Sequence, residues 1–244
     1  MKQIYSFTTK LLLVAAVCAT VLTSCSIRKK EEKGKMVKKE VKVAPFKDLL
    51  VDGNATVNII PGDSFAVRIE GREKIISLAK IEVEDGVLHI SRGNKQSSDV
   101  HEITFGILNG TDYYPRVYIT MPSLRKITLE GNADITIDKP MRGDSVRVLV
   151  ASNADIDVAG LQAKFFDVRI EGNASSSLQN LNVEKTNIVI DGNADLNAVF
   201  KDAGEAEATI NGNASINLSG TIRVEPHINI NGNASVNNNT TRGK

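Results

Sequence analysis

The sequence predicts an all-β protein, built as a parallel β-solenoid with about 20 residues in each coil. A Gly-Asn-Ala tripeptide, or a near copy of it, recurs six times in the second half of the chain, at an almost constant spacing. Apolar and polar residues alternate on both sides of each copy, which is typical of half-buried strands. A fixed period of this length indicates coils that stack on one another. The asparagines of the six copies are Asn132, Asn153, Asn173, Asn193, Asn213 and Asn233.

Each coil is expected to contain three short strands joined by three corners. Ile188–Ile190 exemplify the strand before the tripeptide, Ser215–Leu218 the strand after it, and Leu181–Val183 a weaker third stretch. One coil buries only a few aliphatic side chains, so it is expected to be stable only when it is stacked on its neighbours. A seventh tripeptide, Gly53-Asn54-Ala55, stands alone far upstream of Asn132 and suggests that the chain begins with similar coils.

The tripeptide is interpreted as a corner of the coil. Glycine is expected to supply a positive φ, and asparagine tolerates left-handed geometry. Ser152 replaces glycine in one copy, which suggests that glycine is the more replaceable member. Stacked coils would place successive asparagines roughly 4.8 Å apart. At that spacing each amide can donate to one neighbour and accept from the other, which predicts a ladder of asparagine side chains.

The N-terminal segment has the features of a bacterial lipoprotein signal. Lys2 and Lys10 precede and flank an apolar core over Leu11–Val21, which is short for a membrane span of about 20 residues. The segment ends in Leu22-Thr23-Ser24-Cys25, which resembles a lipobox. Residues 1–24 are therefore predicted to be a signal peptide, and Cys25 the lipid-modified residue through which the protein contacts the membrane. The alternative is an ordinary signal peptide or membrane anchor with an incidental cysteine.

The rest of the chain divides into three parts. Residues 25–42 are predicted to be the lipidated cysteine and a charged tether, because residues 26–42 carry a net charge of +5. Contact of this run with anionic headgroups is the alternative. Residues 43–122 are predicted to be an N-terminal β region, and residues 123–240 the repeat solenoid.

The N-terminal β region lacks the strict period of the repeats. It is expected to contain several strands, a short helix over Lys74–Lys80, and a long loop or hairpin insertion over Gly93–Tyr114. The expected strands are Phe46–Val51, Phe65–Ile69, Val87–Ile90 and Val117–Met121.

The order of these features resembles the head GIN domain family of putative auto-transporter adhesins. The resemblance rests on the lipobox, the strand pair over Phe46–Ile60, the Pro61-Gly62-Asp63 turn, the Tyr118–Leu124 segment and the tandem coils, and it covers roughly residues 43–240. It implies a right-handed parallel β-helix in the envelope of a Gram-negative bacterium. It carries no catalytic residues over to this chain.

No pattern of known catalytic or cofactor chemistry is found. The three histidines, His89, His101 and His227, lack metal-ligand spacing. There is no nucleotide-binding loop, nucleophile elbow or zinc helix motif. Residues 43–244 sum to −6, so no basic patch for nucleic acid is expected. The sequence therefore predicts a non-enzyme without a cofactor, and a polysaccharide-active enzyme is the least favoured function.

A row of polar residues follows the alanines of the corner. Asp134 and Asp155 would lie about 5 Å apart in stacked coils and would repel each other unless they were solvated or bridged by a cation. Calcium is the alternative there, and a solvated polar corner is the expectation. The row consists of Asp134, Asp155, Ser175, Asp195, Ser215 and Ser235.

The function expected from these features is that of an outer-membrane, lipid-anchored envelope protein. Its solenoid would present a long polar face to a surface glycan or protein, with no nucleic acid partner. A structural or assembly lipoprotein without a dedicated ligand is the alternative. Whether the domain faces the cell exterior or the periplasm stays open.

Overall fold

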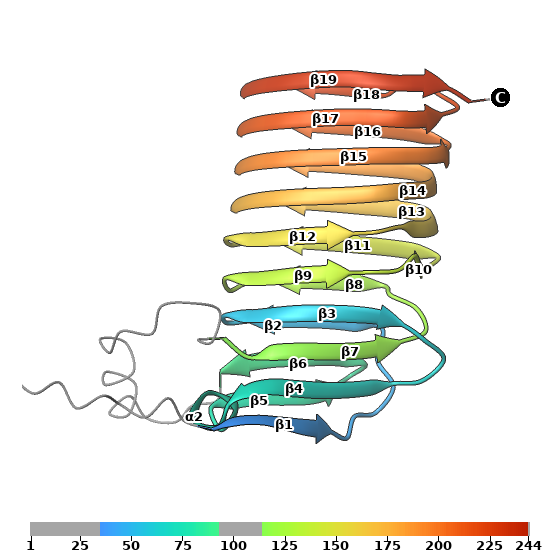
Figure 1. The fold of residues 1–244 in the computed structure, drawn as a ribbon. Helices are drawn as coiled ribbons and strands as arrows, with labels where there is room; N and C mark the ends of the chain where they lie inside the picture. Colours follow the sequence, from blue (N-terminus) through green and yellow to red (C-terminus); the bar gives the residue numbers. More distant parts are fainter. Residues whose placement is uncertain (1–34, 93–113, 244) are drawn as a thin grey trace, which may run out of the picture. The chain divides into compact units, whose positions relative to one another are not determined.

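The computed structural model describes residues 35–92 and 114–243, and these residues form a parallel β-solenoid. The described strands belong to one continuous hydrogen-bonded sheet that coils upward as a right-handed helix (Figure 1). Successive coils are one repeat apart in sequence, as the parallel register of Val148 with Val168 and of Ile188 with Ala208 illustrates. The predicted fold class is therefore confirmed.

Two sets of elements make up this unit. The N-terminal set comprises β1 (Met36–Val41), β2 (Asp48–Asp52), β3 (Ala55–Pro61), β4 (Ala66–Arg72), α2 (Glu73–Ile76), β5 (Ala79–Glu84), β6 (Val87–Arg92) and β7 (Arg116–Met121). The repeat set comprises β8 (Lys126–Leu129), β9 (Ala133–Ile137), β10 (Met141–Arg142), β11 (Ser145–Val150), β12 (Ala154–Val158), β13 (Leu161–Ile170), β14 (Asn173–Ile190), β15 (Asn193–Ala203), β16 (Glu205–Ile210), β17 (Asn213–Ile222), β18 (His227–Ile230) and β19 (Asn233–Arg242).

The predicted three strands per coil are partly merged. β14 runs from the tripeptide corner of one coil to that of the next without interruption, and a register shift between Leu178 and Leu181 marks its bend. The bends in this part of the chain use the left-handed residues Asn180, Asp202 and Gly220. The corners away from the tripeptide are therefore bends within long strands.

The isolated tripeptide at Gly53 belongs to the same stack as the other six. β3 pairs in parallel with β9, with Ala55 opposite Ala133, and β2 pairs with β8, with Leu49 opposite Ile127. The residues between β3 and β8 extend the stack on the other side, where β6 pairs with β2 and β7 with β3. Copies that are far apart in sequence are therefore neighbours in space (Figure 1).

Antiparallel strands close the N-terminal end of the stack. β4 lies antiparallel to both β7 and β1, and β5 lies antiparallel to β6. The prediction of a tether that extends to Lys42 is wrong for Met36–Val41, because these residues form β1. The helix predicted over Lys74–Lys80 is also shorter than expected, since α2 spans Glu73–Ile76 and β5 begins at Ala79.

One hydrophobic core runs through the coils. The inward positions of the strands are aliphatic, and almost all of them are buried from β2 to β17. The core is less well covered in the last coil, where Ile228 and Val236 are only half-buried and Ile230 is 48% exposed. The core is therefore open at the C-terminal end of the stack.

Candidate binding groove along the Gly-Asn-Ala edge

An open groove of about 630 Å³ follows the tripeptide edge across the coils of the repeat set. The inward-pointing alanines Ala174, Ala194 and Ala214 form its floor, between two exposed rows of polar side chains. One row is made by the corner asparagines and the other by the Asp/Ser residues after the alanines. The groove is lined by Asp155, Asn173, Ala174, Ser175, Asn193, Ala194, Asp195, Asn213, Ala214, Ser215 and Asn233.

The asparagine row is a ladder of hydrogen bonds on the outer surface. The Nδ2 atom of Asn153 donates to Oδ1 of Asn132 at 3.2 Å, and Asn173, Asn193 and Asn213 repeat this bond to the coil before them at 2.6, 2.8 and 2.8 Å. All of these side chains are exposed. The ladder uses one N–H and one lone pair of each interior amide, whereas an amide has two of each. Each interior asparagine therefore keeps polar capacity that a ligand can use.

Close contact between coils, rather than positive φ, explains the corner glycines. A Cβ atom on Gly192 would lie 1.9 Å from the carbonyl oxygen of Gly172, and one on Gly212 would lie 1.8 Å from that of Gly192. Among the described glycines, positive φ occurs at Gly53, Gly86 and Gly220. The prediction of positive φ is therefore wrong for the corners of the repeat set, and the corner asparagines are not left-handed either.

Ser152 shows how one corner accommodates a side chain. Its hydroxyl donates to the carbonyl oxygen of Gly131 at 2.6 Å, so the added atoms form a hydrogen bond with the coil below. At the other repeat corners, an added Cβ would lie only 1.8–2.2 Å from a backbone atom of the neighbouring coil. The glycine is therefore replaceable at this corner but constrained at the others.

Two of the three carboxylates in the Asp/Ser row, Asp134 and Asp155, lie in adjacent coils. Asp134 and Asp155 are paired in register, and the backbone N–H of Ser175 donates to Oδ1 of Asp155 at 3.0 Å. Burial, followed by the charges of Asp155 and Asp157, raises the pKa of Asp134 above its usual value, while a backbone hydrogen bond from Asp155 acts in the opposite direction. Within residues 35–92 and 114–243, no three His, Cys, Asp or Glu side chains are arranged to hold a metal ion.

A second polar ladder lies on the other side of the corner glycines, and sequence reasoning missed it. Asn211 donates to Asp191 at 2.6 Å, and Asn231 donates to Asn211 at 3.0 Å. Arg169 bridges Asp191, at 2.6 Å, and Glu171, at 2.7 Å. The signal was present, because a polar residue precedes the glycine in most of the repeats.

Comparison with known proteins identifies the family. Residues 45–240 match the family described as putative auto-transporter adhesin, head GIN domain. The chain belongs to this family. The description is of adhesins and not of enzymes, and it points to a protein of the cell envelope or surface.

Solved structures share the head GIN domain fold. A putative adhesin from Bacteroides fragilis is 19% identical, with a TM-score of 0.54 over 84% of this chain and 97% of that one. A putative adhesin from Parabacteroides distasonis is also 19% identical, with a TM-score of 0.51 over 86% and 95%. At this low sequence identity, the structural similarity shows a common fold and nothing further. No curated protein matches the sequence.

The two described histidines lie outside the groove of this head GIN domain. His89 lies half-buried on β6 and His227 lies exposed on β18, in different coils. Cys25 and His101 lie outside the described residues, and so does the insertion predicted over Gly93–Tyr114 except for Tyr114 itself. In the part of the chain that is described, no helix is long and apolar enough to cross a membrane.

Proposed function

We propose that this head GIN domain protein is anchored by lipid at Cys25 in the outer membrane of a Gram-negative bacterium, and that it binds a glycan or protein in the groove along its Gly-Asn-Ala edge. The observation that carries the proposal is the repetition of one set of side chains in successive coils of one groove: an amide, the methyl group of an alanine, and a carboxylate or hydroxyl. No cofactor is needed for binding of this kind.

Regular spacing suits this groove to an extended, repetitive ligand. Equivalent groups recur roughly every 4.8 Å along the stack, the distance between neighbouring strands. An extended peptide advances by about 3.3 Å per residue, and therefore falls out of step with the coils. A linear glycan, whose sugar rings are longer units, matches the coil spacing better. Each contact is weak, but several coils acting together raise the affinity.

Binding by the full-length protein can be measured on a glycan array and on whole cells. Ser215→Arg places a long side chain in the groove from an exposed position, and it is expected to abolish binding. Ser145→Arg is the matched control, because Ser145 is also exposed but lies on β11, outside the groove. Equal binding by both variants would show that the groove is not the site.

The anchor is tested separately. Cys25→Ala is expected to abolish labelling by a lipid precursor and to release the protein from membranes. A variant that is still lipidated would contradict the anchor. Protease treatment of intact cells then separates a surface location, in which the domain is digested, from a periplasmic one.

A structural role without a ligand is the second candidate. It is favoured by the ladder, in which the corner asparagines bond to one another across the coils rather than to a ligand. Absence of binding on both the array and the cells would support this role. Release of products from an envelope glycan would instead indicate an enzyme.

A further inference from the structure

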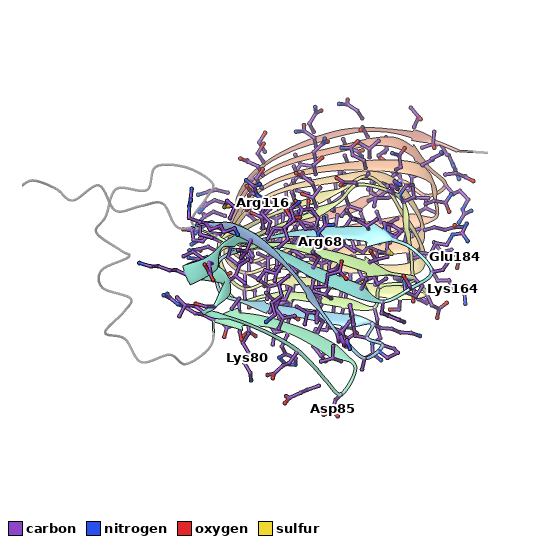
Figure 2. All side chains as sticks on the ribbon, turned by 60° about the horizontal axis from the view of Figure 1, so that its bottom comes forward. Arg68, Lys80, Asp85, Arg116, Lys164 and Glu184 are labelled. Atoms are coloured by element: carbon purple, nitrogen blue, oxygen red, sulfur yellow. The ribbon has the colours of Figure 1, made fainter. Side chains whose placement is uncertain are left out.

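The N-terminal end of the stack is protected against pairing with another strand. Edge strands expose unpaired backbone groups that attract further strands, and charged side chains prevent such pairing. Among the described strands, β1 pairs only with β4, and β5 only with β6. β1 carries Lys38 and Lys39, and β5 carries Lys80 and two glutamates. Figure 2 shows charged side chains, Lys80 and Asp85 among them, extending from this end.

The C-terminal end lacks such charges. β18 pairs only with β16 and β19 only with β17, so each has one open edge in the described structure. Residues 227–241 contain no Lys, Arg, Asp or Glu. The core is also open there, because Ile230 is 48% exposed, whereas Ile210, its partner in the coil below, is 0% exposed. This end therefore presents both unpaired backbone and apolar side chains.

Part of β19 closes its own edge. Asn238 occupies the register position of the buried Leu218. Its Oδ1 atom accepts hydrogen bonds from the backbone N–H of Thr240 at 3.1 Å and from the Thr240 hydroxyl at 2.8 Å. The side chain thus satisfies a backbone donor that a pairing strand would otherwise take. The open surface is therefore centred on β18 and the first half of β19.

We propose that the C-terminal coil binds a second copy of this chain end to end, with β18 antiparallel to β18 of the other copy about a two-fold axis. In such a pairing centred on Asn229, Ile228 of each copy lies opposite Ile230 of the other, and the lack of charge avoids like-charge repulsion between identical surfaces. One coil offers about 20 residues on each side, at the lower limit of a standard interface. Because the other end is charged and capped, the assembly stops at a dimer.

The geometry gives this dimer a role in adhesion. β1 begins at Met36, shortly after Cys25 in the sequence, and lies at the opposite end of the stack from β19 (Figure 1). An end-to-end dimer therefore places the two copies of β1 at opposite ends. Because the proposed anchor at Cys25 precedes β1 in the sequence, we propose that the two anchors belong to two different cells. Each contact is weak, but many copies on apposed surfaces act together. This arrangement between cells rests on the proposed anchor, whereas the pairing of the coils does not.

Sedimentation of the full-length chain carrying Cys25→Ser tests the pairing without lipid. We expect a monomer–dimer equilibrium that Ile228→Lys combined with Ile230→Lys abolishes, with an unchanged circular dichroism spectrum. Met36→Lys is the matched control, because Met36 is 49% exposed on β1 at the closed end, and it should dimerise normally. A monomeric parent chain, or a double variant that dimerises like the parent, would overturn the proposal.

A second variant covers the case in which the double variant misfolds. Asn229→Lys leaves both isoleucines in place and sets two like charges near each other across the antiparallel strands, so it should also yield monomers. Unchanged dimerisation of a folded Asn229→Lys chain would again overturn the proposal.

Cells expressing the lipidated protein test the role between cells. Two differently labelled populations should form mixed aggregates only when both express the unaltered protein, and Ser215→Arg in the groove should leave aggregation intact. Equal adhesion to cells that lack the protein would overturn the homophilic contact. A dimer in solution without aggregation of cells would support the pairing and overturn the anchored arrangement.

Discussion

The repeat set and the N-terminal set share one core, but they use different rules to build it. In the repeat set, residues one repeat apart occupy equivalent places, so that Ile170, Ile190 and Ile210 are all 0% exposed. In the N-terminal set, antiparallel strands such as β4 and β5 close the stack without a repeat. Parallel coils therefore allow the chain to add units, while antiparallel strands end the addition.

The largest expected effect compares the interior of the repeat set with its open end. Ile210→Ala should lower the free energy of unfolding by about 3–4 kcal/mol, because it leaves a cavity in a fully buried position. Ile230→Ala, one coil later in the same register, should cost less than about 1 kcal/mol, because that side chain is half in solvent. Urea denaturation at concentrations that keep the protein monomeric measures both. Similar losses of unfolding free energy in the two variants would mean that Ile230 is shielded from solvent.

A smaller effect separates the two reasons for glycine. Gly192→Ala should cost about 2–3 kcal/mol, because the added Cβ meets the carbonyl oxygen of Gly172 and the coils must separate. Gly86→Ala should cost about 1 kcal/mol, because its surroundings are open and only its φ of 76° opposes a side chain. Thermal unfolding of the two variants measures the difference. A larger loss for Gly86→Ala would show that backbone conformation outweighs contact between coils.

The predictability of the fold follows the same division. The period of the tripeptide was enough to predict the coils, because each repeat meets the same neighbours. β1 was missed because its lysines face solvent on an edge strand and therefore read as a tether. The stacking of Gly53 beneath Gly131 could not be predicted, since the residues that intervene in sequence pair with the other side of the same coil.

The candidate site was only partly predictable. The corner asparagines were expected to form a ladder from their spacing alone. The prediction that the corner glycines supply a positive φ was wrong. Their role is close contact with the carbonyl oxygens of the adjacent coil, which depends on how the coils stack. The groove between the asparagine row and the Asp/Ser row is lined by residues of several coils. Its depth likewise depends on how these coils stack, so the groove is visible only in the structure.

The asparagine ladder gives a third comparison. Asn193 donates to Asn173 and accepts from Asn213, whereas no such bond joins Asn233 to Asn213 in the described residues. Asn193→Ala should cost about 1 kcal/mol, because it breaks two exposed hydrogen bonds, and Asn233→Ala should be nearly neutral. Chemical denaturation of both variants measures the costs. Equal costs would show that the hydrogen bonds between coils add nothing to the stability that each asparagine gives within its own corner.

The smallest expected effect concerns the pH dependence that Asp134 contributes. Because the folded-state pKa of this carboxyl is raised, its protonated form is favoured in the folded protein, and its stabilising contribution is complete below the unfolded-state pKa. That contribution is lost as the pH rises through the folded-state pKa. At neutral pH, Asp134→Asn should therefore stabilise the protein by a few tenths of a kcal/mol, since the group is partly solvated. The melting temperatures of the variant and the parent should differ at pH 7 and converge near pH 3. A variant that is less stable than the parent at pH 7 would mean that the carboxylate makes a favourable contact, and addition of calcium would then test whether a cation supplies it.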